Sequence, residues 1–127
     1  MTRKIIKTDD APAAIGPYSQ GNAAGGFLFT AGQIPLDPAT MKVVGTTAAE
    51  QTAQALANAR AVVQAGGLTL DDVVKVTVFI RDMREFGAIN QVYSSFFSTN
   101  PPARSVVEVS RLPKDVLVEI EMVAYRS

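Results

Sequence analysis

Hydrophobic and polar residues alternate most clearly near the end of the chain, in the segment VLVEIEMVAY at 116–125. One set of alternate positions is entirely apolar: Val116, Val118, Ile120, Met122 and Ala124. The other set mixes apolar residues with the carboxylates of Glu119 and Glu121. Because successive side chains of a strand point to opposite faces, this pattern predicts a strand with one face against a core.

Other segments with the apolar or β-branched composition of strands are 4–7, 27–31, 72–80 and 103–109. Alternation directs the even-numbered positions of 74–80 toward the core. The prolines and glycines of APAAIGPYSQG at 11–21 predict a loop between the first two strands.

The last two predicted strands follow each other closely, and we expect them to pair as a hairpin. That pairing would place Arg104 opposite Glu121 and Val106 opposite Glu119. A shift of two residues in the pairing would still keep Arg104 near a carboxylate, because Glu119 and Glu121 are two residues apart.

Two segments have the signals of helices. Thr47 and Glu50 form a capping box, and the alanine-rich helix after it is expected to run to Gly66, a left-handed stop. Apolar residues at helical spacing predict a second helix, which begins at Asp82 and ends before the Asn-Pro-Pro sequence at 100–102.

This order of strands and helices predicts one α+β domain over residues 1–127, with both helices on the apolar face of the sheet. The opposite face mixes apolar and charged residues, and is less polar than a face toward water. Charged residues are also scarce, at 19% against 47% apolar. We therefore expect other copies of the chain to cover this mixed face.

The composition excludes several classes of function. Lys and Arg total 12, as do Asp and Glu, so the formal net charge is zero and nucleic acid is a poor partner. No segment suits a membrane span or a signal peptide, so a cytoplasmic location is expected. The chain has no histidine and no cysteine, which excludes His- or Cys-based metal sites and nucleophilic relays.

Arg104 begins its predicted strand, and alternation groups it with Val106 and Glu108 on the mixed face. Two interpretations stay open from the residues alone. Arg104 forms an interface ion pair with Glu119 or Glu121, or its guanidinium binds the carboxylate of a ligand through two parallel hydrogen bonds. In the second case a nearby glutamate would manage a proton or a water molecule.

Four segments then resemble a known family: APAAIGPYSQG at 11–21, TAGQIPLDP at 30–38, 90–97, and PPARSVVEVSRLPKDVLVEIE at 101–121. They resemble the RidA/YjgF family of reactive intermediate deaminases, over essentially the whole chain. The resemblance implies a chorismate mutase-like fold with a mixed sheet, and a homotrimer whose sheets line a central barrel. It also implies sites between subunits that hydrolyse 2-imino acids such as 2-iminobutanoate and 2-iminopropanoate to 2-oxo acids and ammonia, without a cofactor or metal.

The resemblance also assigns roles by position. Arg104 would hold the substrate carboxylate, Glu119 would orient or activate the attacking water, and Tyr18 would close the cleft and hydrogen-bond near the imine. Gly32 would offer backbone close to the ligand. Without the resemblance, Tyr18 would more simply pack a turn, and Gly32 would serve turn geometry.

Three further positions are implied less directly. The main-chain amide of Val106 would contact the ligand, and Asn90 would shape the cleft, although on residues alone it would bond a neighbouring loop. Ala31 stands where many family members have a serine at the site. This difference leaves the rate and the substrate preference open.

Two alternative functions remain. A non-catalytic trimer that binds small carboxylates, or acts like a chaperone, would keep Arg104 without needing Glu119, and Ala31 motivates this alternative. A ribonuclease is the other, but the zero net charge and the missing histidine argue against it.

Overall fold

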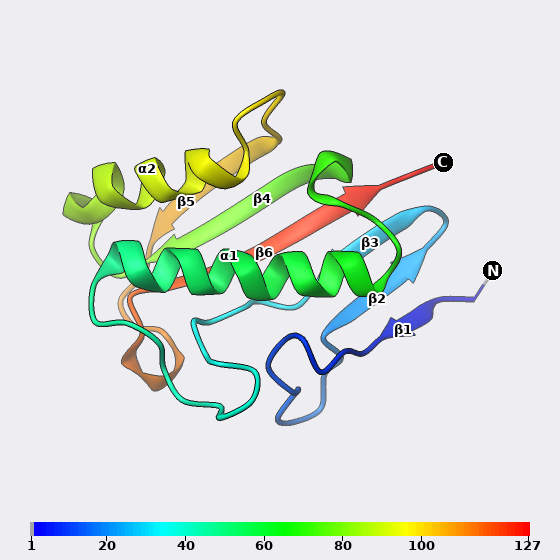
Figure 1. Ribbon diagram of the computed structural model, residues 1–127, viewed down its shortest axis with the longest axis horizontal. Helices are drawn as coiled ribbons and strands as arrows, with labels where there is room; N and C mark the ends of the chain where they lie inside the picture. Colours follow the sequence, from blue (N-terminus) through cyan, green and yellow to red (C-terminus); the bar gives the residue numbers. More distant parts are fainter. Residues whose placement is uncertain (1) are drawn as a thin grey trace.

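Six strands form one sheet, and both helices pack on the same face of it, in the computed structural model, which describes residues 2–127 (Figure 1). The strands are β1 (Lys4–Ile6), β2 (Gly21–Ala24), β3 (Phe27–Thr30), β4 (Val73–Ile80), β5 (Ala103–Glu108) and β6 (Val118–Tyr125). The helices are α1 (Ala48–Ala65) and α2 (Phe86–Phe96), and 3₁₀ turns lie at η1 (Leu70–Asp72), η2 (Met83–Glu85) and η3 (Pro113–Asp115). The predicted α+β class is confirmed.

The strands lie across the sheet in the order β1-β2-β3-β6-β4-β5, and among these described strands only β4 and β5 run parallel. The predicted hairpin of the last two strands is wrong, because β6 pairs with β3 and β4 and not with β5. Helix α2 joins β4 to β5, and such a helical crossover returns the chain parallel to the strand it left. Segment 109–117 then leads past the end of β4 to the middle of the sheet (Figure 1).

Strand β2 falls in and just after the segment that the sequence predicts as a loop. Its residues, Gly-Asn-Ala-Ala, have none of the β-branched or aromatic character of strands. The strand is imposed by a tight turn at Gly25 and Gly26, whose φ angles of 57° and 91° suit a two-residue hairpin. Gly21 is also required, because a Cβ there would lie 2.8 Å from Val62 Cγ1.

The core lies between the sheet and the helices. The predicted alternation is confirmed, because the four core positions within β6 and Val116 just before it are all buried. In β4 the prediction fails only at Val74. The register shifts between Val73 and Lys75, so Val73 is buried and Val74 is exposed. A β-bulge of this kind inserts one extra residue and reverses the alternation on one side of it.

The two helices begin and end differently from each other. The capping box of Thr47 and Glu50 is confirmed, and α1 ends at Gly66. The left-handed residue is Gly67, with φ 85°, whereas Gly66 is needed because a Cβ there would overlap Leu28. Before α2, Asp82 caps the short turn η2 and not α2 itself. Within residues 2–127, no helix has the length and apolar character of a membrane span.

The face of the sheet opposite the helices, here called the open face, carries exposed aromatic residues. Phe27, Phe29 and Tyr125 have 42%, 48% and 39% of their surface exposed, and the rings of Phe27 and Tyr125 lie 4.7 Å apart. Exposed rings in such a group are typical of a surface that another molecule covers.

Candidate functional site

The pairing of strands places the two main candidate residues on opposite faces of the sheet. Val76 of β4 pairs with both Arg104 and Met122, so Arg104 lies on the helix-covered face. Glu119 pairs with Phe79 on the open face. The prediction that Arg104 shares a face with Glu119 and Glu121 is therefore wrong within one chain. It depended on the hairpin, and it assumed that the apolar residues of β5 face the helices.

Arg104 lies under one stripe of helix α2. Its Nη1 donates to Asn90 Oδ1 at 2.8 Å, and its Cζ lies 4.6 Å from the ring centroid of Tyr93 and 5.5 Å from that of Phe86. Positions 86, 90 and 93 recur at the i, i+4, i+7 spacing of one helix face. No ion pair among residues 2–127 includes Arg104, so its charge is free for an anionic ligand.

The main-chain amide of Val106 points toward the free edge of the sheet. Val109 N donates to Ile80 O of β4 at 2.8 Å, which continues the ladder between β4 and β5. Amides of successive strand residues point to alternate edges, so those at 106 and 104 point away from β4. Arg104, Asn90 and Val106 therefore form one group, here called the arginine half-site.

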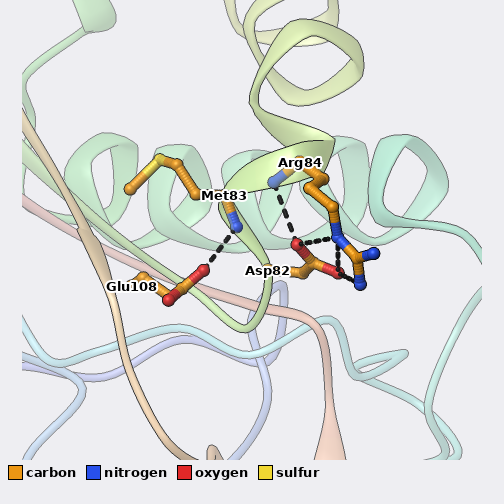
Figure 2. Close-up of polar contacts among 4 residues, drawn as sticks. All are labelled: Asp82, Met83, Arg84 and Glu108. Atoms are coloured by element: carbon orange, nitrogen blue, oxygen red, sulfur yellow. Dashed lines mark hydrogen bonds and ion pairs between the residues drawn. The ribbon is translucent and has the colours of Figure 1, made fainter.

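Two carboxylates accept hydrogen bonds at the turn before α2, and one of them joins this turn to β5 (Figure 2). Glu108 accepts a hydrogen bond from Met83 N at 2.7 Å, which ties the end of β5 to the turn before α2. Asp82 accepts from Arg84 N at 2.9 Å and pairs with its guanidinium at 2.7 Å, which holds the pKa of Asp82 down at about 2. The bond from Met83 to Glu108 links the turn before α2 to the strand that carries Arg104, and alternation alone gave no sign of it.

Glu119 lies against Gly32 at the start of β6. A Cβ at residue 32 would overlap Glu119 Oε2, so glycine is the residue that leaves room for the carboxylate. The neighbouring backbone is fixed by Gln33 N, which donates to Ile120 O at 2.7 Å, and by Ile120 N, which donates to Gln33 O at 3.0 Å. The expectation that Gly32 offers backbone close to a ligand stays a prediction.

The protonation of Glu119 is also perturbed. Burial raises the pKa of Glu119 above its ordinary value, and the negative charge of Glu121 raises it further. A carboxylic acid whose pKa is shifted toward neutrality can give and take a proton more readily at physiological pH. Glu119 is therefore suited to proton transfer as well as to binding water.

Tyr18 lies on an exposed loop beside the same group, with 52% of its surface exposed. It lines a pocket of about 250 Å³ together with Gly32, and a second of about 380 Å³ together with Ala31. Its hydroxyl accepts a hydrogen bond from Ile15 N at 3.4 Å. Tyr18, Ala31, Gly32 and Glu119 form the glutamate half-site.

Gln20 holds this loop in place, a role that no motif in the sequence signals. Its buried Nε2 donates to the carbonyls of Ala11 and Pro12 at 3.2 and 2.8 Å. Its main-chain carbonyl accepts from Ala31 N at 2.8 Å. Gln20 therefore holds the loop that carries Tyr18 through its side chain, and joins it to the strand end that carries Ala31 through its main chain.

The two half-sites offer anion binding and proton transfer separately. A single chain keeps them on different faces of the sheet. Across residues 2–127, no three or more acidic side chains gather in a way that would hold a metal ion.

Comparisons with known proteins agree over nearly the whole chain. The endoribonuclease L-PSP family model matches residues 8–126. A RutC family protein of Pyrococcus horikoshii is 52% identical over 124 residues, covering 98% of each chain. The 2-iminobutanoate/2-iminopropanoate deaminase of Escherichia coli is 50% identical over 126 residues, covering 97% of this chain and 98% of that protein.

Among solved structures, that of TdcF from E. coli with bound serine has a TM-score of 0.94 and 48% identity, covering 98% of this chain and 99% of the other. Both the sequence and the arrangement of strands and helices therefore agree with those of known members. The chain belongs to the endoribonuclease L-PSP family, which is also called the RidA/YjgF family.

Proposed function

We propose that this protein hydrolyses reactive 2-imino acids, such as 2-iminobutanoate and 2-iminopropanoate, to 2-oxo acids and ammonia. The observation that carries the proposal is the guanidinium of Arg104, which has no acidic partner among residues 2–127 and has hydrogen-bond donors left for a carboxylate. The E. coli relative named as an imine deaminase, at 50% identity, supports this reaction. The E. coli structure with bound serine supports a small ligand with a carboxylate.

The proposed site is completed between two subunits of a homotrimer. The arginine half-site of one chain would face the glutamate half-site of its neighbour, because one chain holds them on opposite faces of its sheet. The exposed aromatic residues of the open face support a contact with other copies. A symmetric ring of three subunits would contain three such composite sites.

In the proposed reaction, Arg104 binds the substrate carboxylate with two parallel hydrogen bonds, and the Val106 amide adds a donor at the sheet edge. Glu119 accepts a proton from water as the water oxygen bonds to the imine carbon. That proton passes to the nitrogen, which gives a carbinolamine with a hydroxyl and an amino group on the same carbon. Glu119 then moves the hydroxyl proton to the amino nitrogen, the carbon–nitrogen bond breaks, and ammonia leaves as the 2-oxo acid forms. Tyr18 would donate a hydrogen bond near the reacting atoms and cover the cleft.

This chemistry suits a site of this composition. The carbon of an imine is already electrophilic, so the proposed mechanism uses no cofactor and no covalent nucleophile. Catalysis consists of holding the carboxylate, placing a water molecule and moving protons, which is largely a matter of position. Ala31 offers no hydroxyl, so any hydrogen bond that serine would supply in relatives is absent here.

The direct test is an assay in which a threonine dehydratase generates 2-iminobutanoate, and semicarbazide competes for it. The wild-type protein should accelerate loss of the imine. Arg104→Ala and Glu119→Gln should each lower kcat/KM by about a hundredfold or more, because each removes a charged contact or the proton carrier.

The outcomes separate the alternatives. Imine decay that the wild-type protein leaves unchanged would contradict the enzyme and favour a carboxylate-binding trimer. In that case Glu119→Gln would still bind 2-oxobutanoate, and Arg104→Ala would not. Size-exclusion chromatography with light scattering serves as the control, since a variant that loses its assembly would reveal a structural role for the changed residue.

A further inference from the structure

The aromatic rings of α2 that flank Asn90 suggest a role beyond that of core residues. Tyr93 is 5% exposed and lies directly against the Arg104 guanidinium. Phe86, at the other end of the same stripe, is 37% exposed and meets the guanidinium from the side of the N-terminal turn. We call Tyr93 and Phe86 the aromatic shelf.

The Tyr93 ring is held rigidly, but its hydroxyl is not used. The ring centroid lies 4.9 Å from that of Phe97, which is itself buried. The hydroxyl is buried and has no hydrogen-bond partner among the described residues. The hydroxyl therefore donates and accepts no hydrogen bond with Arg104. The contact between the two residues is that of the guanidinium with the face of the ring.

Of the N–H groups of the Arg104 guanidinium, one is hydrogen-bonded within the chain and the others are available to a ligand. The ring faces attract the cation through their π electrons and hold its plane beside α2. Asn90 accepts one hydrogen bond, from Nη1. The other N–H groups stay available in the plane of the guanidinium, where a carboxylate binds through two parallel bonds.

We propose that the aromatic shelf is a positioning element for carboxylate recognition, which orients Arg104 toward the substrate while Asn90 fixes its rotation. This inference rests on the proposed function and deepens it, because it states that the specificity for anionic substrates is set by rings on α2. Neither ring needs to touch the substrate. A flexible arginine without the shelf would lose entropy on binding the carboxylate and would bind it more weakly.

The test measures binding of two ligands of similar shape, one with a charged carboxylate and one with a neutral amide in its place. Calorimetry gives the Kd of 2-oxobutanoate and of its neutral amide, 2-oxobutanamide, and their ratio reports on the guanidinium. Tyr93→Leu should raise the Kd of the acid by about three- to thirtyfold and leave that of the amide within about twofold. Tyr93→Phe should keep the wild-type ratio, because it retains the ring and removes only the unpaired hydroxyl.

Two further variants keep the test decisive. Phe86→Leu changes an exposed ring, so it should fold even if Tyr93→Leu does not, and it should likewise raise the Kd of the acid relative to that of the amide. Phe96→Leu is the matched control, because Phe96 is on the same helix and its ring contacts a different cation, Arg60, at 5.0 Å. This control should leave both affinities unchanged.

Steady-state kinetics of the same variants should agree with their binding affinities. In the imine assay, the shelf variants should raise KM and leave kcat within about twofold, since the shelf acts on substrate binding and not on the proton carrier. Equal weakening of acid and amide, or an unchanged ratio in both shelf variants, would overturn the inference. A wild-type protein that binds acid and amide equally, or an Arg104→Ala variant with an unchanged ratio, would instead contradict the proposed function.

Discussion

Glu119 carries a carboxyl group whose charge depends on its surroundings. Burial, and then Glu121, raise its pKa, so the folded protein holds this proton more tightly than the unfolded chain does. The stability that this proton contributes is fully present below the ordinary pKa of a glutamate. It is lost as the pH rises through the raised pKa of the folded state.

A neutral isostere at this position should therefore be more stable at neutral pH. Glu119→Gln should have a higher free energy of unfolding than wild type at pH 7.5, and the difference should shrink toward zero by about pH 4. Urea unfolding at both pH values measures it. An advantage for the variant that is equal at both pH values would mean that burial of charge is not its cause.

Gly32 should affect catalysis because the absence of a side chain there leaves room for the Glu119 carboxylate. Gly32→Ala puts a methyl group where the Glu119 carboxylate lies, and the end of a flexible side chain can move aside. We expect the protein to fold and kcat for imine hydrolysis to fall by about ten- to a hundredfold, because the proton carrier is displaced. The Kd of 2-oxobutanoate should change less than kcat, and the reverse pattern would contradict this explanation.

At the scale of elements, loop 8–20 depends on one buried side chain. Gln20→Leu would leave the carbonyls of Ala11 and Pro12 without the amide donor. We expect a loss of about 1–3 kcal/mol in the free energy of unfolding, measured in urea. The exposed Gln64 on α1 provides the matched control, and Gln64→Leu should change stability by less than about 0.5 kcal/mol.

The sequence predicts best the elements that are determined locally. The capping box at Thr47 and the alternation of β6 each depend on residues within a few positions, and both are confirmed. Strand β2 and the place of β6 between β3 and β4 depend on partners far along the chain, which alternation does not indicate.

The same limit applies to the candidate site. Tyr18, Gly32 and Glu119 do lie in one region. Tyr18 and Gly32 line the same pocket, and Gly32 lies against Glu119 because the backbone of Gln33 pairs with that of Ile120. Arg104 does not join them within the chain, because its face depends on pairing with β4, which no local pattern reveals. The importance of Gln20 was also hidden, since its hydrogen bonds reach a segment that has no regular structure.

At the scale of the whole molecule, the proposed assembly can be tested by mixing two inactive variants. Arg104→Ala keeps the glutamate half-site, and Glu119→Gln keeps the arginine half-site. If sites lie between subunits, unfolding and refolding an equal mixture should restore roughly a quarter of the wild-type activity, since a quarter of random interfaces combine two intact halves.

A double variant supplies the control for this mixing experiment. Replacing either partner with a chain that carries both changes should give no recovery, because no interface then contains two intact halves. Equal activity of the mixture and of the separate variants would mean that each chain works alone, and would contradict the composite site.

The position of Arg104 and Glu119 on opposite faces of one sheet has a consequence for how activity varies with protein level. Under the proposed function, a solitary folded chain contains every reacting residue and is still inert. The specific activity should then rise with protein concentration until the subunits are fully associated. It should fall when the protein is diluted below the concentration at which they associate. A cell that makes little of this protein would then have almost no hydrolysis of 2-imino acids by it, and a modest increase in synthesis would bring that activity to its full level per chain.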